Sequence, residues 1–202
     1  MKKLFAFIIC SLLLLSFFLV TVSAATTHTV VKGDSMWKIA VKYEVGLNEI
    51  KQANPQIANP DLIYPGQILN IPLTDSSVLS FEKEVVRLVN VERQKSGLRS
   101  LTYDWELSRV ARIKSQDMKD RNYFSHTSPT YGSPFQMMKS FGISYRSAGE
   151  NIARGQATPQ AVVKAWMNSA GHRANILNSS FTHIGVGYVE NGKYWTQMFV
   201  GK

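Results

Sequence analysis

The chain has 202 residues, with 23 Lys and Arg against 14 Asp and Glu, which makes its formal net charge +9. This length suits one domain of medium size together with a small one. The only cysteine, Cys10, lies within an N-terminal apolar segment, so the rest of the chain excludes a disulfide-stabilised fold and a cysteine nucleophile.

Residues 1–25 have the pattern of a secretory signal peptide. Two lysines precede an apolar run over residues 4–22, and the small residues that follow include Ala24 and Ala25. We predict cleavage after one of these alanines and secretion of the remaining chain. A retained membrane anchor is the alternative, because the 19-residue run is at the lower limit for crossing a bilayer. Only in that case is a membrane an expected partner.

Positive charge is concentrated in the C-terminal part of the chain. Residues 26–73 contain four Lys and four acidic residues, whereas residues 80–202 contain 17 Lys and Arg against 9 acidic residues. A basic exported domain suits the anionic polymers of a cell wall. No nucleic-acid-binding motif is present, and the expected export also argues against nucleic acid as a partner.

Residues 27–73 predict a small unit with the order strand, helix, helix, strand. The apolar residues after Ser35 recur at helical spacing, with Trp37 expected in the core, and Gly46 is expected to stop this helix. The expected elements are a strand at 28–31, a helix from 36 to 46, a helix from 47 to 54 and an alternating strand at 67–71.

The stretch from 28 to 72 resembles a LysM domain along its whole length. The residues that carry the resemblance are VKGDS at 31–35, Asn54-Pro55, and YPGQ at 64–67 before Ile71-Pro72. The resemblance implies binding of N-acetylglucosamine polymers, such as peptidoglycan or chitin-like glycan. The binding site is then a groove between two loops, at 33–36 and 59–64. The sequence at 58–67 is also similar to that of LysM modules in spore-coat and spore-cortex proteins.

The residue types in these two loops suit a sugar chain. Such a ligand needs short polar groups for its acetamide and hydroxyl groups and apolar surface for its ring faces. The predicted glycan contacts are Gly33, Asp34, Ser35, Met36, Asn59, Pro60, Asp61, Leu62 and Ile63. Helix capping by Asp34 or Ser35 and turn formation by Gly33 and Pro60 are the alternative explanation of the same residues.

A polar linker is expected at 74–80, and residues 81–202 then predict an α+β domain. Helical periodicity or start signals predict helices at 81–97, 104–121, 134–141 and 159–168. Two alternating segments at 184–189 and 194–200 predict strands, which the Asn191-Gly192 turn joins as a hairpin. Helices that flank an antiparallel sheet predict an α-β-α sandwich.

Four ordered motifs in this domain resemble the CAP superfamily, which includes cysteine-rich secretory, antigen 5 and pathogenesis-related 1 proteins and is also called SCP-like. The motifs are YFSHTSP at 123–129, AGENIA at 148–153, AVVKAWMNSAGHRANIL at 161–177 and GVGYVENGKYWTQMF at 185–199. The domain is most similar to the compact bacterial branch, which lacks the disulfides.

Three residues of these motifs are candidates for chemistry, namely His126, Glu150 and His172. Two imidazoles and a carboxylate can act as acid and base or bind zinc, although no metal-binding spacing such as H-E-x-x-H is present. The resemblance implies a cleft with His126 and Glu150 at the first histidine and first glutamate of the family. Ser169 and Tyr194 stand where the second glutamate and second histidine are expected, so the tetrad is incomplete. We therefore assign no metal, with zinc at His126 and His172 as the alternative.

The sequence thus favours a secreted protein of the cell wall or spore that binds peptidoglycan through its LysM module. The CAP domain is then a second binding module, for which anionic wall polymers or spore proteins are expected partners. One alternative is a wall-remodelling hydrolase that uses His126 and Glu150. The other is a component of spore-coat or cortex assembly without catalysis.

Overall fold

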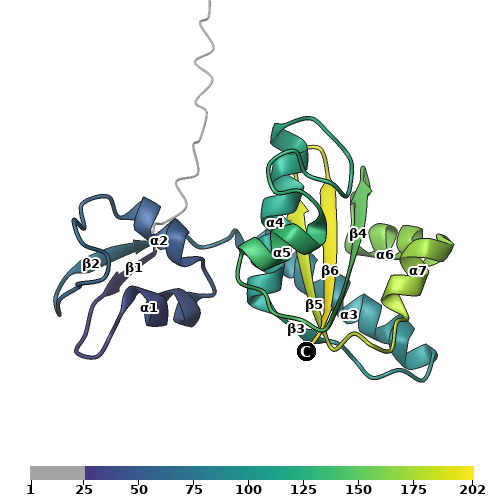
Figure 1. The fold of residues 1–202 in the computed structure, drawn as a ribbon, viewed down its shortest axis with the longest axis horizontal. Helices are drawn as coiled ribbons and strands as arrows, with labels where there is room; N and C mark the ends of the chain where they lie inside the picture. Colours follow the sequence, from purple (N-terminus) through teal and green to yellow (C-terminus); the bar gives the residue numbers. More distant parts are fainter. Residues whose placement is uncertain (1–25) are drawn as a thin grey trace, which may run out of the picture.

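The computed structural model describes residues 26–202, so the predicted signal peptide lies outside the described residues. The ribbon forms two modules, a small one from β1 to β2 and a larger one that begins with α3 (Figure 1). Over this described range, no helix is both long and apolar enough to cross a membrane.

The small module has the predicted order of elements. It consists of β1 (Thr26–Thr29), α1 (Met36–Tyr43), α2 (Leu47–Ala53) and β2 (Ile68–Ile71). The two strands pair antiparallel, with Thr26 opposite Ile71. Both helices pack their apolar faces on this two-stranded sheet through a compact core that includes Ile39, Ile50 and Leu69.

Two details of α1 differ from the prediction. Trp37 was expected in the core but is 53% exposed, because Met36 and Ile39 occupy the buried face of the helix and Trp37 points away from it. The helix also ends at Tyr43, where Glu44 adopts a left-handed conformation with φ 53°. Gly46 instead precedes α2 as its N-cap.

The larger module contains five helices and four strands among the described residues. They are α3 (Ser76–Lys95), β3 (Thr102–Tyr103), α4 (Trp105–Asp120), α5 (Pro134–Ser140), β4 (Ser147–Arg154), α6 (Pro159–Asn168), α7 (Ala170–Ile176), β5 (His183–Val189) and β6 (Tyr194–Gly201). The sheet order is β3-β5-β6-β4, and only the β3–β5 pair is parallel.

The start of this module corrects the predicted linker at 74–80. Helix α3 already begins at Ser76, and the Asp75 carboxylate accepts a hydrogen bond from the Ser77 amide at 2.7 Å. Asp75 is therefore a helix cap, and the polar residues that follow it form the first turn of α3. The non-helical connection between the modules is correspondingly shorter than predicted.

The α-β-α sandwich is confirmed. Helices α3, α6 and α7 share one core with the sheet, around Trp166, Trp195 and Phe199. Helices α4 and α5 pack on the opposite face through a second core that includes Leu107 and Met198. The central sheet lies between these two helical layers in Figure 1.

Two glycines of β5 allow α4 to lie directly on the sheet. A Cβ atom on Gly185 would lie 2.3 Å from the backbone carbon of Leu107, and one on Gly187 would lie 2.1 Å from the backbone nitrogen of Arg112. Helix α4 therefore packs at backbone contact distance, which only glycine permits. This close packing positions the side chains that α4 contributes to the candidate site.

Candidate functional site

Glu150 of the edge strand β4 forms a hydrogen-bonded pair with His126. The Glu150 side chain is 1% exposed, and its Oε1 lies 2.7 Å from Nδ1 of His126, which is itself 52% exposed. His126 comes from the loop after α4, whereas Glu150 lies in the middle of β4. The structure therefore brings together the two residues that the motifs predicted as partners.

A buried lysine anchors the loop that carries His126. Lys114 of α4 is fully buried, and its Nζ donates hydrogen bonds to the carbonyl oxygens of Ser125 at 2.8 Å and His126 at 2.9 Å. Its third contact is the Tyr123 hydroxyl at 3.0 Å. Lys114 was not singled out from the sequence, although it lies on the same helical stripe as the apolar residues Leu107 and Met118. The position of a lysine on such a stripe was the signal that could have identified it, because a buried lysine needs hydrogen-bond or charge partners.

Burial controls the electrostatics of this pair. Burial raises the pKa of the Glu150 carboxyl, and the hydrogen bond from His126 and the charge of Lys114 oppose this shift without reversing it. Burial also lowers the pKa of Lys114, which the charges of Glu150 and Asp117 counteract. Glu150 Oε2 is buried and accepts no hydrogen bond from the described residues. This oxygen is the atom that would carry the proton of the neutral carboxyl.

A second carboxylate, Asp117, supports the same loop. It accepts hydrogen bonds from the hydroxyls of Tyr123, Ser128 and Thr130 at 2.5, 2.7 and 2.8 Å. Burial acts to raise the pKa of Asp117, but the three hydroxyl hydrogen bonds outweigh it and the net shift is downward. Asp117 is thus an ionised structural group whose oxygens are already engaged.

The backbone of His172, on α7, lies beside β4. Asn151 donates to the His172 carbonyl at 3.1 Å, and Asn175 donates to the Glu150 carbonyl at 3.1 Å and to the Asn151 side chain at 2.9 Å. Burial lowers the pKa of the His172 imidazole, and the charge of the nearby His126 lowers it further. Asn151 therefore ties α7 to β4, with Gln197 as its other partner at 2.9 Å. Asn175 was not predicted as part of this region, because no local pattern in a short helix indicates that its side chain bonds to a neighbouring strand.

The donor set does not fit zinc. Within residues 26–202, no group of three or more His, Cys, Asp or Glu side chains gathers in a way that could hold a metal ion. His126 already uses Nδ1 for Glu150, and a catalytic zinc site needs about three protein ligands.

In the small module, the first predicted groove loop is held by its own polar side chains. Asp34 Oδ2 accepts hydrogen bonds from His28 Nε2 at 2.8 Å and from the Val31 amide at 3.0 Å. These contacts hold the pKa of Asp34 below its usual range. Ser35 caps α1 by accepting from the Lys38 amide. Met36, predicted to offer apolar surface to the glycan, is instead 3% exposed and belongs to the core.

The second groove loop presents its apolar surface to solvent. The Asn59 side chain accepts a hydrogen bond from the Asp61 amide at 3.0 Å and so forms a turn around Pro60. Leu62 is 52% exposed, and Ile63 is half-buried against the core. Gly33 has a φ of 93°, which only glycine adopts readily, so it shapes the first loop. His28, which positions Asp34, was not predicted as part of this region.

Two family models match the chain. Residues 28–72 match the LysM domain, and residues 86–201 match the cysteine-rich secretory protein (CAP) family. The chain belongs to the CAP family and carries a LysM domain. Its CAP domain contains no cysteine, in agreement with the predicted disulfide-free branch.

Curated relatives match each part of the chain separately. The uncharacterized protein YkwD of Bacillus subtilis (strain 168) is 72% identical over 127 residues, which cover 63% of this chain and 49% of that protein. The SpoIVD-associated factor A of the same organism is 56% identical over 45 residues, which cover 22% of this chain and 12% of that protein. The chain therefore spans half or less of the length of these relatives.

A solved structure confirms the fold of the CAP domain. An extracellular protein of Bacillus anthracis that contains an SCP domain is similar with a TM-score of 0.60 and 37% identity. The match covers 68% of this chain and 47% of that one.

Proposed function

We propose that the chain is a secreted protein of the cell wall or spore that binds N-acetylglucosamine chains of peptidoglycan through its LysM domain. The observation that carries this proposal is the pair of loops at 33–36 and 59–64 in a LysM domain. Hydrogen bonds of Asp34 and Asn59 hold both loops in shape, and Leu62 stays exposed beside them. A preformed surface of this kind limits the entropy that glycan binding costs.

The location of the protein follows from the same module. The LysM domain associates the chain with peptidoglycan, and the likeness of residues in this module to SpoIVD-associated factor A supports a spore layer as one such place. The vegetative cell wall is the other. Fluorescence microscopy of a tagged chain during growth and sporulation distinguishes the two locations.

The CAP domain is proposed as a second binding module. Hydrolysis of a glycosidic bond commonly uses two carboxyl groups that both face the scissile bond. Glu150 has one oxygen without a partner among residues 26–202, but Asp117 has its oxygens engaged by three hydroxyl groups. The site therefore supports binding better than glycan cleavage.

A hydrolase is the second candidate, and one observation favours it. A buried Glu150 with a raised pKa, next to His126, is the kind of group that acts as a general acid. In such a reaction, the protonated Glu150 carboxyl gives its proton to Nδ1 of His126 while the exposed side of the imidazole gives its own proton to the leaving group, and water adds to the other fragment. Digestion of purified peptidoglycan by the wild type and by Glu150→Gln tests this directly. Release of fragments by the wild type but not by the variant would establish the enzyme.

Glycan binding is tested with two matched variants of the secreted chain. Leu62 and Ile68 are exposed apolar residues of the same module, at 52% and 61%, but only Leu62 lies in a groove loop. We expect Leu62→Ala to weaken sedimentation with insoluble peptidoglycan about tenfold, or ~1.4 kcal/mol. Ile68→Ala should bind like the wild type. Failure of the wild type to sediment with peptidoglycan or chitin would refute the proposed function.

A further inference from the structure

The two modules are joined by an ion pair that the sequence did not suggest. Arg109 of α4 makes two hydrogen bonds of 2.7 Å to the carboxylate of Glu49 on α2. The same guanidinium lies 5.3 Å from the centre of the Phe141 ring. A Cβ atom on Gly46 would lie 2.1 Å from Arg109 Nε, so the glycine leaves room for the guanidinium in this position. The LysM domain therefore contacts α4 of the CAP domain through its helix α2.

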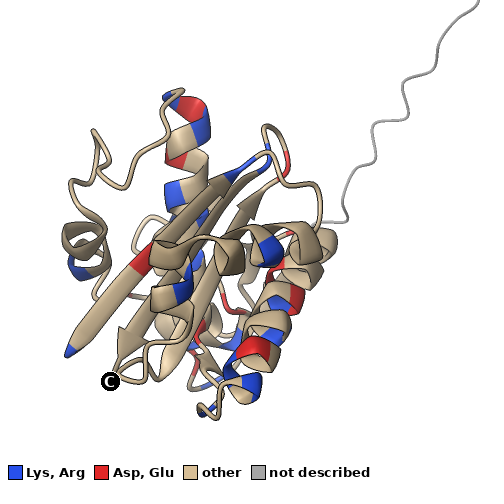
Figure 2. Cartoon of the chain, turned by 90° about the vertical axis from the view of Figure 1, so that its right-hand side faces the viewer, with Lys and Arg blue, Asp and Glu red and all other residues tan. Residues whose placement is uncertain are grey.

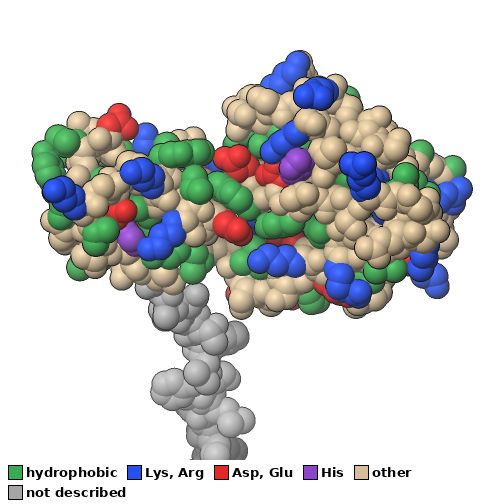
Figure 3. Space-filling model, turned by 90° about the horizontal axis from the view of Figure 1, so that it is seen from below, with side chains coloured by type: hydrophobic (Ala, Val, Ile, Leu, Met, Phe, Trp, Pro, Cys, Tyr) green, Lys and Arg blue, Asp and Glu red, His purple; other side chains and the backbone are tan. Residues whose placement is uncertain are grey.

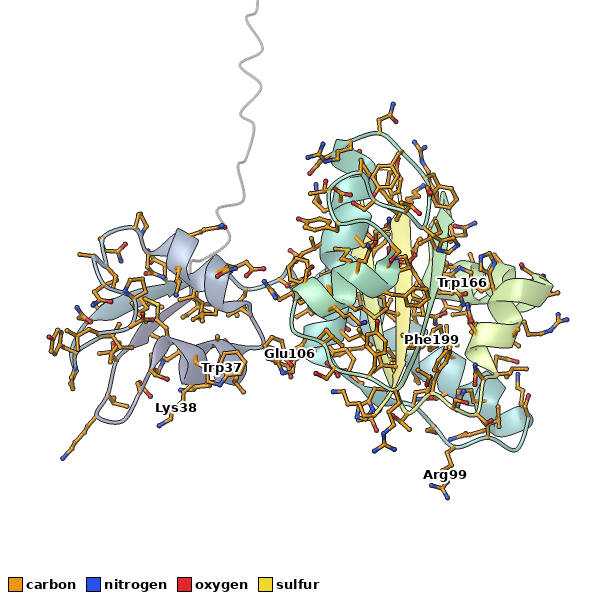
Figure 4. The ribbon with its side chains drawn as sticks, in the orientation of Figure 1. Trp37, Lys38, Arg99, Glu106, Trp166 and Phe199 are labelled. Carbon is orange, nitrogen blue, oxygen red and sulfur yellow. The ribbon has the colours of Figure 1, made fainter. Side chains whose placement is uncertain are left out.

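A pocket of about 530 Å³ opens on the CAP domain near this contact, and all of its lining residues belong to the CAP domain. Its lining includes Glu106, which lies one helical turn before Arg109 on α4, and the segment 142–146 that directly follows Phe141. In Figure 4, Glu106 and the exposed Trp37 of the LysM domain both lie where the two modules meet. Figure 3 shows hydrophobic and acidic side chains together at this junction.

The pocket offers opposite charges that have no partner within residues 26–202. The Arg146 guanidinium is exposed, and neither it nor the Glu106 carboxylate makes an ion pair or a side-chain hydrogen bond there. The third charged residue of the lining, Lys202, is already paired with Asp104 at 2.7 Å. Ile143 and Tyr145 add apolar surface to the wall. The complementary ligand carries both a carboxylate and an ammonium group on a short, partly apolar chain.

We propose that this pocket binds the short zwitterionic peptide that peptidoglycan carries on its glycan chain. The inference rests on the proposed function, because the LysM domain must hold the glycan for its peptide to reach the pocket. Arg146 pairs with a peptide carboxylate, and Glu106 pairs with a peptide amino group. The ion pair between Glu49 and Arg109 keeps the pocket next to the glycan-binding module. Binding of the glycan thus raises the effective concentration of the peptide at the pocket.

The test compares two soluble ligands with the secreted chain by titration calorimetry. One is an N-acetylglucosamine oligomer, and the other is a peptidoglycan fragment of the same glycan length that retains its peptides. We expect the peptide-bearing fragment to bind about tenfold tighter. Arg146→Ala and Glu106→Gln should each remove most of this gain and leave the affinity for the peptide-free oligomer unchanged.

A matched control separates pocket binding from general charge attraction. Arg99 is also exposed, but it lies away from the junction at the lower end of the CAP domain (Figure 4). Arg99→Ala should keep the full gain. Equal affinity of the wild type for both ligands would overturn the inference and leave the proposed function intact. A higher affinity for the peptide-bearing fragment that neither Arg146→Ala nor Glu106→Gln reduces would have the same meaning. Absence of binding to either ligand would refute the proposed function itself.

The contact between the modules provides an independent test. Glu49→Arg and Arg109→Glu should each reduce the gain from the peptide, because like charges then face each other across the junction. The double variant restores an opposite pair and should recover the gain. If the three variants keep the wild-type preference, the two modules do not act together on one ligand.

Discussion

The two candidate sites of this protein differ in how their polar side chains are held in position. In the LysM loops, Asp34, Ser35 and Asn59 bond to atoms within six residues of themselves. In the CAP site, Glu150 pairs with a residue 24 positions away, on a loop that a lysine of another element anchors. Asn59 is exposed and Asp34 and Ser35 are half-buried, whereas Glu150 is buried and keeps one oxygen without a partner among the described residues.

The difference shows what each site depends on. A loop stabilised by its own neighbours keeps its shape with little help from the rest of the fold. A buried carboxylate depends on every element that surrounds it, because any lost partner leaves an uncompensated charge. The CAP site should therefore respond to distant changes, and the LysM loops should respond only to local ones.

The surface charge of the CAP domain bears on its expected partners. In the view of Figure 2, basic and acidic residues are interspersed along the helices rather than gathered by sign. A mixed surface of this kind provides general attraction to a polyanion through its net charge and not through a focused patch. On the side of the domain in this view, this arrangement favours the pocket over a broad cationic face as the specific contact.

The largest effect is expected from Gly187→Ala, which tests the dependence on distant packing. The added methyl group would collide with the backbone of α4 and shift Lys114. We expect unfolding free energy to fall by about 3 kcal/mol, measured by chemical denaturation. Gly171→Ala is the matched control, because its Cβ meets nothing within 4 Å. A Gly187→Ala variant as stable as this control would show that α4 can move freely.

Lys114→Met removes the anchor of the His126 loop. The carbonyl groups of Ser125 and His126 lose their charged donor, so we expect a loss of about 2–3 kcal/mol in unfolding free energy. The NMR signals of His126 should also shift as the loop loosens. Lys164→Met changes an exposed lysine of α6 and should cost under about 0.5 kcal/mol. Equal stability of the two variants would contradict the anchoring role.

Glu82 tests whether a buried carboxylate without a histidine partner behaves like Glu150. Its Oε1 accepts from the Tyr188 amide at 3.0 Å and lies 3.6 Å from Arg112 Nε, while Oε2 has no partner among the described residues. Burial raises the pKa of Glu82 from 4.5 to about 7, and the charge of Arg112 opposes this shift.

The sign of the resulting pH dependence follows from linkage. Between these two values, the folded state binds more protons at Glu82 than the unfolded state, so stability falls as pH rises. We expect about 2 kcal/mol to be lost from pH 5 to pH 7. Glu82→Gln should remove that part of the slope in urea unfolding at the two pH values. An unchanged slope would mean that Glu82 is ionised throughout this range.

The smallest effect is expected from Ser35→Ala in the LysM domain. Loss of the cap on α1 should cost about 1 kcal/mol, visible as faster amide exchange in α1 but not in the CAP domain. Ser35→Asp keeps a capping side chain and should exchange like the wild type. If Ser35→Ala also weakens binding to the oligomer and Ser35→Asp does not, the cap is what shapes the groove. Altered exchange in the CAP domain would contradict the local character of this site.

Helices with a clear apolar period were predicted within a few residues. The prediction of 159–168 agrees with α6, and 104–121 agrees with α4 apart from its end residues. Their signals are local, since apolar spacing and capping residues lie within the element itself. The hairpin of β5 and β6 was predicted for the same reason, from alternation and the Asn191-Gly192 turn.

Elements without such a local signal were missed. Strand β4 buries five consecutive residues, from Gly149 to Ala153, because it is covered on both faces. It therefore has no two-residue alternation. The short β3 and α7 lack enough residues for a period. For the same reason, the motif around Glu150 was noticed while the strand that carries it was not.

By itself, the sequence determined which modules the chain contains, the order of most of their elements, and the pair His126 and Glu150. These depend on motifs and on spacing within short segments. Only the tertiary structure decided that Trp37 is exposed, that Met36 is buried, that Lys114 holds the His126 loop and that Arg109 joins the two modules. Each of these depends on contacts between residues distant in sequence or on which face of an element is covered. Residue type and local spacing carry no information on such contacts until the chain has folded.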